Sequence, residues 1–211
     1  MIVTCGPVPA EVIEVGDVHL AMMSRPNDAT QGRLGGAFRE TVRRSGVVPS
    51  PLAWDFALLA LAVIGADHAC LRSNSPDGWT RQIELHVALV EPDSWRPHVQ
   101  EIEDALRFLT GDIWSICLHS GGLAALPRTG RVRRPRVSGD CVCLLSGGMD
   151  SLVGAIDLAR HGARPILVSQ VAKGDTDRQA RFARAIDPML DHVQLSHAAT
   201  VPVSTITETR A

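Results

Sequence analysis

The stretch Cys141-Val142-Cys143-Leu144-Leu145-Ser146-Gly147-Gly148-Met149-Asp150-Ser151 decides the fold of the second half of this 211-residue chain. Its first five residues form a continuous apolar run, which is typical of a strand buried in a parallel sheet. The Ser-Gly-Gly that follows predicts a tight turn. After the turn, Leu152, Ala155, Ile156 and Ala159 repeat with the period of a helix that buries one face. The sequence therefore predicts strand, loop and helix in direct succession.

The residues after this helix continue the same alternation. Gly162 stands where a helix commonly ends in a left-handed residue, and Pro165–Ser169 predicts a second buried strand. Thr176–Ile186 predicts a polar helix that Pro188 ends, and His192–Ser196 predicts a short third strand. Strands that alternate with helices through brief connections are typical of a parallel sheet.

The loop between the first strand and its helix has the composition of an anion-binding site. Gly147 and Gly148 lack Cβ atoms, so positive φ angles are open to them and backbone N–H groups can converge on phosphate oxygens. The N-terminus of the following helix adds the positive end of its dipole. Ser146 and Ser151 offer hydroxyl donors. Asp150 repels phosphate, so we expect it to orient the loop or to help bind a divalent cation that bridges the phosphates.

A purely structural interpretation of the same residues competes with this one. Many strand-to-helix junctions contain Ser-Gly-Gly as a tight turn, and Asp150-Ser151 is an ordinary way to begin a helix. The segment lies between a buried strand and a helix, at the start of a βαβαβ succession. That context favours nucleotide binding over the structural alternative.

The segment Ser146–Ser151 resembles the SGGxDS signature of the PP-loop ATP pyrophosphatases. That superfamily is built on a doubly wound parallel sheet, so the resemblance implies an α/β fold with a partial sheet of this PP-loop, HUP-like type. From Cys141 onward the chain is most similar to the 7-cyano-7-deazaguanine synthase (QueC-like) branch. Over nearly its whole length it resembles the longer QueC-like proteins of bacterial anti-phage islands, the QatC type, through segments such as 79–83 and 108–114.

The resemblance implies an ATP- and Mg²⁺-dependent, ligase-like enzyme. The substrate carboxylate would attack the α-phosphate of ATP, pyrophosphate would leave, and an amine would then take the acyl group from the adenylate to give an amide or nitrile. Of the implied residues, Asp150 and Ser151 are catalytic and Ser169 lies near the adenosine, beyond the carboxyl end of its strand. The implied ATP-binding set is Ser146, Gly147, Gly148, Met149, Asp150, Ser151 and Ser169.

The chain also departs from the QueC-like pattern. Such enzymes have further strands and zinc-binding cysteines beyond the position of Ala211, so we expect an incomplete ATP-binding domain in a chain that is cut short. No metal site is predicted within these residues, and zinc is expected only if a further C-terminal segment supplies cysteines. The alternative function is a non-catalytic module that senses nucleotide or scaffolds proteins. The expected partners are ATP, an unknown carboxylate and proteins of a defence operon.

The first half of the chain predicts a separate, smaller α+β domain. The helix that begins at Pro97 would bury Val99, Ile102, Leu106 and Leu109. Strands are predicted at Met1–Thr4, Val12–Met22, Trp79–Val90 and Ile113–His119, and helices at Leu52–Leu71 and Pro97–Leu109. The Gly-, Pro- and Arg-rich composition between Ser120 and Asp140 predicts a linker. The expected domains are 1–126 and 139–211, joined by a linker at 127–138.

Composition and charge narrow the range of functions. A net charge of -2 gives no general attraction to nucleic acid or to an anionic membrane. The arginines between Arg128 and Arg136 lack interleaved aromatic residues, so we interpret them as a solvated linker. The five cysteines contain no CxxC pair, which favours a reduced, cytoplasmic location. The longest apolar run, Phe56–Ala66, is about half of what a bilayer crossing needs, so we expect a soluble protein.

The remaining candidate side chains receive structural interpretations. None of the eight histidines lies in an HxH or HxxxH pattern, and His86 and His119 are assigned to the surface of predicted strands rather than to catalysis. Cys141 and Cys143 share one face of a buried strand, as core residues do. The four tryptophans, all in the first half, are interpreted as core residues in preference to a partner-binding surface.

Overall fold

A computed structural model of the chain describes residues 1–15, 17–23, 32–125, 137–171 and 174–201. The chain divides into two compact units. The first comprises Met1–Gly36, Pro49–Ala125 and Ala198–Ala211, and the second comprises Ala37–Val48 and Leu126–His197. Most of the predicted linker and the whole segment Arg128–Arg136 lie outside the described residues.

The first unit is built on a six-stranded, mostly parallel sheet. All neighbouring strands in it are parallel except β3 and β9. In spatial order the strands are β5 (Ile113–Ser120), β4 (Gln82–Leu89), β1 (Ile2–Cys5), β2 (Val18–Met22), β3 (Gly32–Leu34) and β9 (Ala199–Thr200). The α+β arrangement predicted for this half is therefore wrong, because its strands alternate with helices and so form a parallel α/β sheet.

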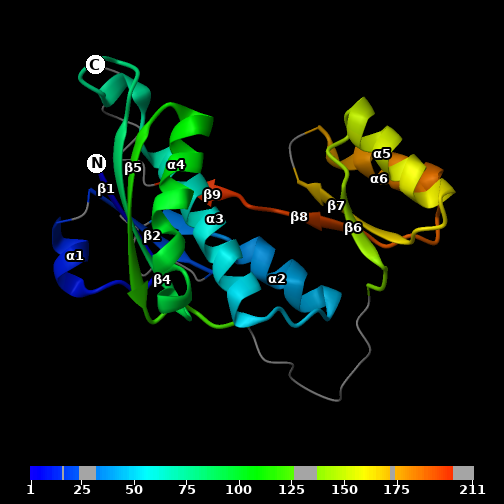
Figure 1. The fold of residues 1–211 in the computed structure, drawn as a ribbon, viewed down its shortest axis with the longest axis horizontal. Helices are drawn as coiled ribbons and strands as arrows, with labels where there is room; N and C mark the ends of the chain where they lie inside the picture. The colour runs from blue at the N-terminus through cyan, green and yellow to red at the C-terminus, as the bar shows by residue number, and fades with distance from the viewer. Residues whose placement is uncertain (16, 24–31, 126–136, 172–173, 202–211) are drawn as a thin grey trace. The chain divides into compact units, whose positions relative to one another are not determined.

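Helices lie on both faces of this sheet. α3 (Pro51–Ala69) and α4 (Val99–Thr110) lie on one side and the short α1 (Ala10–Val15) lies on the other (Figure 1). α1 occupies part of the segment that was predicted as a strand from Val12. Two adjacent parallel strands, β1 and β2, need a crossover connection, and α1 forms it. Three short 3-10 helices, Arg72–Asn74, Pro92–Ser94 and Arg96–His98, complete the connections.

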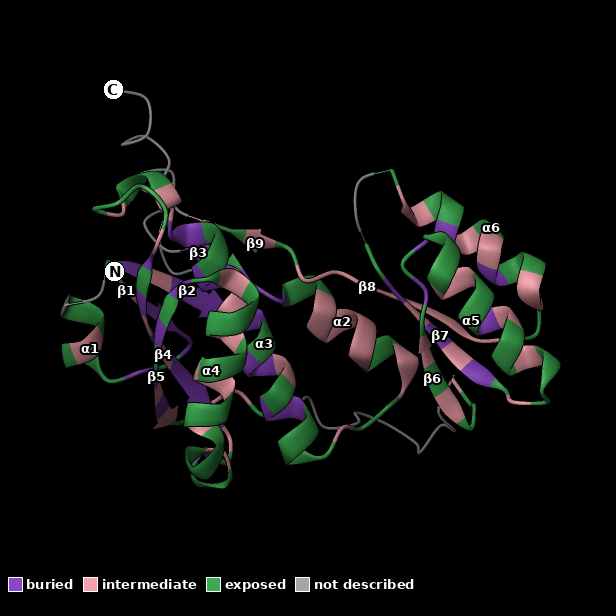
Figure 2. Ribbon diagram, turned by 45° about the horizontal axis from the view of Figure 1, so that its top comes forward, coloured by how far each residue is buried: buried purple, intermediate pink, exposed green. Residues whose placement is uncertain are grey.

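The core of the first unit lies between the sheet and α3, as the buried residues in Figure 2 show. A Cβ atom at Gly65 would come within 2.7 Å of methyl carbons of Leu20 and Leu34, so glycine lets α3 approach the sheet closely. The core interpretation is confirmed for Trp54 and Trp114, which are 2% and 5% exposed. It is wrong for Trp79, which is 67% exposed and packs over the guanidinium group of Arg72.

The two helices on this face differ in how much they bury. α3 has the length and composition of a membrane-spanning helix, with a mean hydropathy of 1.4, but half of that span is buried within the protein. It is the core helix of the first unit, which is consistent with a soluble protein. α4 buries less than predicted, since none of its residues is buried and Leu109 is 75% exposed.

Buried charges join β4 to the start of β5. The Asp112 carboxylate is fully buried and accepts hydrogen bonds from the backbone N–H and Nε of Arg81 at 3.0 Å each. Arg72 Nη1 lies 3.0 Å from the same carboxylate. Burial alone would raise the pKa of Asp112, but the hydrogen bonds from Arg81 outweigh that effect and lower it. The carboxylate is therefore charged in the folded protein at neutral pH.

The sheet face opposite α3 and α4 carries a row of polar side chains. The strand register places His19, Thr4, His86 and Cys117 side by side across β2, β1, β4 and β5. The side chain of His86 is 12% exposed, and its ring stacks on that of His119 with centroids 5.1 Å apart. The surface interpretation of His86 is therefore wrong. It failed because the parallel register, which local spacing does not reveal, brings the two rings together.

The second unit contains a three-stranded parallel sheet in the order β6 (Cys141–Leu144), β7 (Pro165–Gln170) and β8 (His192–Leu195). α5 (Met149–Arg160) and α6 (Thr176–Ile186) follow its first two strands. The predicted βαβαβ succession is confirmed, and α6 begins and ends at the predicted residues. Gly162 adopts the predicted left-handed conformation after α5, with a φ of +84°.

The core of this small sheet lies on one face, under α5 and α6. Leu145, Ala155, Leu167 and Ala183 form it, and Cys143, Phe182, Ile186 and Leu190 pack around them. Cys143 packs against this core as predicted, but both Cys143 and Cys141 are only half-buried. On the opposite face Val142 and Leu144 are 64% and 73% exposed. A doubly wound sheet needs helices on both faces, and α5 and α6 cover only one.

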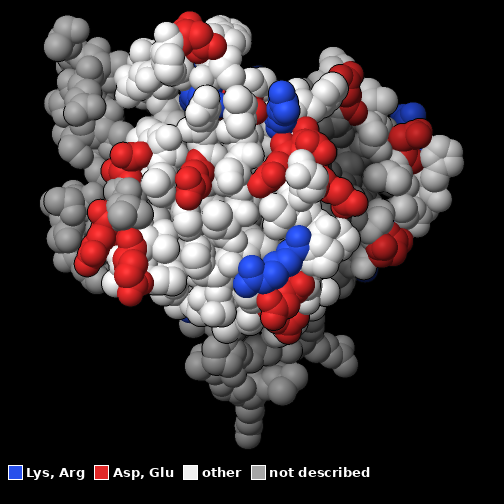
Figure 3. Space-filling view, turned by 60° about the vertical axis from the view of Figure 1, so that its left-hand side comes forward, with Lys and Arg blue, Asp and Glu red and all other residues white. Residues whose placement is uncertain are grey.

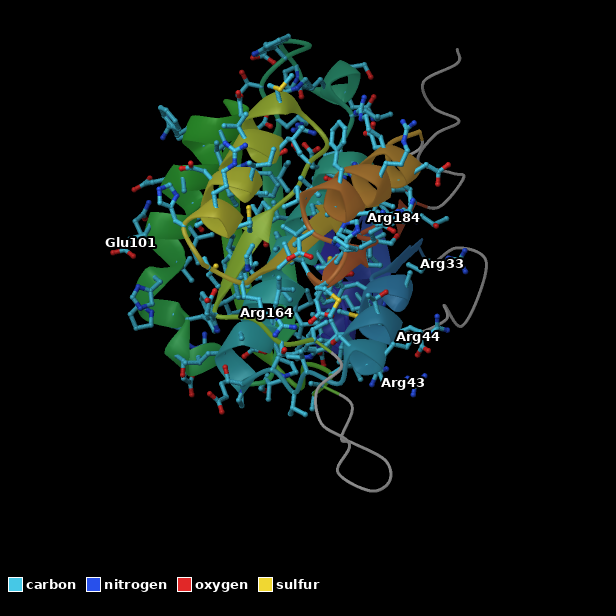
Figure 4. All side chains as sticks on the ribbon, turned by 90° about the vertical axis from the view of Figure 1, so that its right-hand side faces the viewer. Arg33, Arg43, Arg44, Glu101, Arg164 and Arg184 are labelled. Atoms are coloured by element: carbon cyan, nitrogen blue, oxygen red, sulfur yellow. The ribbon has the colours of Figure 1, made fainter. Side chains whose placement is uncertain are left out.

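The remaining helix, α2 (Gly36–Ser45), lies in the Gly- and Arg-rich stretch for which the sequence predicted no element. Most of it groups with the second unit. Glu40 bonds Arg43 Nη2 at 2.6 Å and Arg44 Nε at 2.7 Å, and both arginines project outward in Figure 4. These hydrogen bonds lower the pKa of Glu40 to about 2.

Candidate functional site

The loop from Ser146 to Gly148 connects the carboxyl end of β6 to the first residue of α5. Gly147 is buried and adopts a φ of +92°, in the region that favours glycine. Gly148 is the N-cap of α5. The two glycines thus have different roles, because Gly147 makes the left-handed turn and Gly148 begins the helix.

The two serine hydroxyls close a ring of hydrogen bonds around this turn. The N–H of Gly148 donates to Ser146 Oγ at 3.3 Å, and Ser151 Oγ donates to the Gly148 carbonyl at 3.0 Å. Ser146 Oγ and Ser151 Oγ are 3.0 Å apart. Each hydroxyl therefore finds a partner inside the loop. Ser146 and Ser151 therefore hold the loop through their own hydrogen bonds, and backbone N–H groups are the donors open to an anion.

Those backbone donors lie in the first turn of α5. The first helical hydrogen bond runs from the N–H of Leu152 to the Gly148 carbonyl, so the N–H groups of Met149, Asp150 and Ser151 have no partner within the helix. Ser146, Gly148, Met149 and Asp150 are exposed to solvent. The positive end of a 12-residue helix is therefore accessible at this loop.

A basic side chain lies beside the turn. A Cβ atom at Gly147 would come 3.3 Å from Arg178 Nε, so the absence of a side chain there leaves room for this guanidinium group. Arg178 comes from the first turn of α6, where its Nη2 bonds Asp175 Oδ1 at 2.6 Å. The loop thus combines the N-terminus of a helix with a cation from a neighbouring helix.

Asp150 and Met149 both point to accessible positions. Asp150 is exposed in the first turn of α5, and within the described part of the chain its carboxylate forms no ion pair. The expectation that Asp150 orients the loop therefore has no contact to support it. Its carboxylate is free to bind a cation. Met149 is 72% exposed and contributes only its backbone N–H to the loop.

Ser169 lies behind the loop, at the carboxyl end of β7. It is 2% exposed, and its hydroxyl donates to the Leu145 carbonyl at 2.6 Å. His192 Nε2 lies 2.8 Å from the same hydroxyl oxygen. Because the hydroxyl hydrogen is already donated to Leu145, the Nε2–H group of His192 donates to the hydroxyl oxygen. Burial lowers the pKa of His192, which favours the neutral ring. Ser169 therefore joins the three strands of the sheet immediately before the loop.

Two glutamines that the sequence did not single out complete the support of the loop. Gln179 of α6 is 2% exposed, and its amide nitrogen donates to the carbonyls of Ser146 at 3.1 Å and Gln170 at 3.0 Å. Gln194 of β8 donates to the Thr176 carbonyl at 3.0 Å. The carboxyl ends of all three strands are thus joined to α6 by side-chain amides.

The sequence contained a signal for Gln179. The inner face of α6 has the helical spacing of the buried Gln179 and Ala183 and the partly buried Phe182 and Ile186. A polar residue in the apolar stripe of a helix indicates a buried hydrogen-bonding role, because a buried amide needs partners. Arg178 had no comparable signal, since its position beside Gly147 depends on how α6 packs against the loop.

The arrangement is suited to binding an anion at the carboxyl end of a parallel sheet, where ligands of α/β proteins commonly bind. It offers backbone donors, a helix dipole and one guanidinium group. In comparisons with protein-family models, curated proteins and solved structures, none matches this chain. The function must therefore be argued from these residues and their contacts.

Proposed function

We propose that the second unit binds the phosphate groups of ATP, with Mg²⁺, at the loop of residues 146–151. The observation that carries the proposal is the accessible N-terminus of α5, which follows a left-handed glycine and has Arg178 beside it. Backbone N–H groups at such a terminus attract phosphate oxygens. The resemblance of SGGMDS to the PP-loop signature selects ATP among possible anions.

The proposed reaction is the adenylation of a carboxylate. A carboxylate oxygen attacks the α-phosphorus, the bond from that phosphorus to the bridging oxygen breaks, and pyrophosphate leaves with its charge. The N–H groups of Met149, Asp150 and Ser151 would stabilise that growing charge, and Arg178 would add a positive charge. An amine then displaces AMP from the acyl adenylate to give an amide. The nitrile that the QueC-like resemblance also implies would require ammonia as the amine and a second ATP, which adenylates the amide oxygen so that it leaves with AMP.

Asp150 is the residue of the loop that would bind Mg²⁺. Mg²⁺ is commonly bound by one or two carboxylates together with substrate phosphates and water, so a single exposed carboxylate fits this ion. The cation would offset the repulsion between Asp150 and the phosphates.

Calorimetric titration of the chain with Mg·ATP tests the proposal. Saturable binding is expected, and Gly147→Val should weaken it by at least about tenfold, because the new side chain meets Arg178 and strains a residue at φ +92°. Gly162→Val is the matched control, since Gly162 has a φ of +84° and open space around it at the other end of α5. This control imposes a similar backbone strain away from the loop and should leave ATP affinity unchanged.

The choice of ligand separates the possible outcomes. Pyrophosphate should compete with ATP, whereas AMP, which lacks the leaving group, should compete poorly. No saturable binding by the unmodified chain would overturn the proposal. Binding without pyrophosphate release, over a panel of carboxylates, would favour the alternative of a non-catalytic nucleotide sensor.

A further inference from the structure

Four side chains that could bind a metal lie together on the polar face of the first unit. Glu84 and His86 are two residues apart on β4, and Cys117 and His119 are two residues apart on β5. Side chains of a strand alternate between faces, so each pair lies on one face. The register pairs His86 with Cys117 and Ala88 with His119, which brings the two pairs together.

The donor atoms of these residues are close to one another. His86 Nε2 lies 2.8 Å from Glu84 Oε1, and His86 Nδ1 lies 2.9 Å from His119 Nε2. One oxygen of Glu84, one ring nitrogen of His86 and Cys117 Sγ all lie within 4.8 Å of one another. In a tetrahedral zinc site, bonds of about 2.0–2.3 Å separate the ligand atoms by roughly 3.5 Å. Rotations of the side chains can therefore reach that geometry without a change in the strands.

The cluster is also open on one side. The side chain of Glu84 is 45% exposed and that of His86 is 12% exposed, while Cys117 is partly buried. Neither α3 nor α4 covers it, because both lie on the other face of the sheet (Figure 1). The view that brings the side of α1 forward shows more acidic than basic side chains (Figure 3). The exposed side chain of Glu84 therefore gives a divalent cation access to the site.

We propose that Glu84, His86 and Cys117 bind a divalent transition metal of the zinc class, with a fourth position open to water. Nitrogen, oxygen and sulfur ligands in one set suit zinc better than magnesium or calcium, which prefer oxygen ligands alone. Three protein ligands with one open position are typical of zinc sites that also bind a small molecule. The site is independent of the proposed ATP-binding loop, since it lies in the other unit.

His119 is a positioning residue in this proposal. When His86 binds the metal through Nε2, its Nδ1–H donates to His119 Nε2, at the distance of 2.9 Å already present. Such a bond to the second ring nitrogen fixes the tautomer and the orientation of a metal-binding histidine. Residues in this role typically contribute about 10–100-fold to metal affinity.

Titration of the untagged full chain with Co²⁺, followed by competition with Zn²⁺, tests the site. One equivalent of Co²⁺ should give the charge-transfer absorption of a cobalt–thiolate bond, and Zn²⁺ should abolish it. Cys117→Ser should remove this absorption. Cys141→Ser is the matched control, because Cys141 is another partly exposed cysteine on a strand, in the second unit, and its loss should change nothing.

Variants of His119 distinguish positioning from direct binding. His119→Ala should weaken Co²⁺ binding by about 10–100-fold while the cobalt–thiolate absorption at saturation remains. His119→Gln keeps an acceptor and should restore much of the affinity. The proposal is overturned if the unmodified chain gives no thiolate absorption with Co²⁺, or if Cys117→Ser leaves that absorption unchanged. Tryptophan fluorescence verifies that each variant is folded, since all four tryptophans lie in the first unit.

Discussion

The two candidate sites are assembled in opposite ways. The loop of the second unit comes from six consecutive residues, and its proposed donors are mostly backbone N–H groups at a helix terminus. The cluster of the first unit comes from two strands, through side chains about thirty positions apart that only the register of β4 and β5 brings together. A site of the first kind is visible in a sequence, whereas a site of the second kind requires the fold.

Because each site is built within one unit, we expect each site to be lost when its own unit unfolds. All four tryptophans lie in the first unit, and the chain contains no tyrosine. Tryptophan fluorescence therefore reports unfolding of the first unit alone, while far-ultraviolet circular dichroism reports both. Urea unfolding followed by the two signals can therefore separate the transitions of the two units.

Asp112→Ala should have the largest effect. It leaves Arg81, which is 7% exposed, without its buried partner, and breaking such a pair typically costs about 3–5 kcal/mol. The fluorescence transition should move to lower urea. Asp104→Ala, at an exposed position of α4, should change the free energy of unfolding by less than about 0.5 kcal/mol. An equal shift of the second unit's transition would contradict the independence of the two units.

Leu167→Ala should have the next largest effect, now in the second unit. Leu167 is fully buried in the core under α5 and α6, where removing a leucine side chain costs about 2–5 kcal/mol. The part of the circular dichroism change that comes from the second unit should move to lower urea, while the fluorescence transition stays in place. Val142→Ala, on the exposed face of the neighbouring strand, is the control and should have little effect. A matching loss of fluorescence would show that the first unit needs the second.

The sequence predicted the second unit better than the first, for identifiable reasons. Both ends of α6 were predicted correctly, because Thr176–Ile186 has a clear helical period and Pro188 follows it. α1 was interpreted as a strand because six residues are too few to show a helical period. β9 was missed because it consists of two residues whose partners, Arg33 and Leu34, are more than one hundred positions away.

For the residues of the two sites, too, the sequence predicted what depends on local order and missed what depends on the fold. Ser146 to Ser151 could be named from their order, but the closed ring of their hydroxyls could not. The sequence placed Ser169 near a ligand, whereas the structure shows its hydroxyl bonded to Leu145 and His192. The cluster of Glu84, His86 and Cys117 could not be predicted from spacings within one segment, because pairing between two strands brings these residues together.

Gln179→Leu should lower the stability of the second unit less than Leu167→Ala does. It should also weaken the binding of Mg·ATP at the loop. It leaves the carbonyls of Ser146 and Gln170 without their donor, which costs about 1–3 kcal/mol. The circular dichroism transition should shift accordingly, and the affinity for Mg·ATP should fall because the loop loses its support. Arg181→Leu, at an exposed position of the same helix, controls for the added apolar side chain. Unchanged stability and affinity would show that Gln179 does not support the loop.

The smallest expected effect is a dependence on pH in the second unit. Burial lowers the pKa of His192 below its ordinary value of 6.5, so the folded state favours the neutral ring. This contribution to stability is complete above pH 6.5 and is lost as the pH falls toward the lowered pKa. His192→Gln should remove the loss of stability that the circular dichroism transition shows as the pH falls below 6.5. A dependence that persists in this variant would assign it to another group.

The pairing of β9 with β3 makes the first unit discontinuous in sequence. The chain leaves that unit after Ala125, forms most of the second unit and returns at Ala198. Cleavage between residues 126 and 136 alone would leave the two units connected at 36/37, at 48/49 and at 197/198. A fragment that ends at Ala125 would lack β9 and expose the edge of β3, which invites pairing with other chains. Each unit consists of more than one segment of the chain, so neither can be expressed alone as one continuous fragment, and a tail that covers β3 should improve the solubility of a fragment of the first unit.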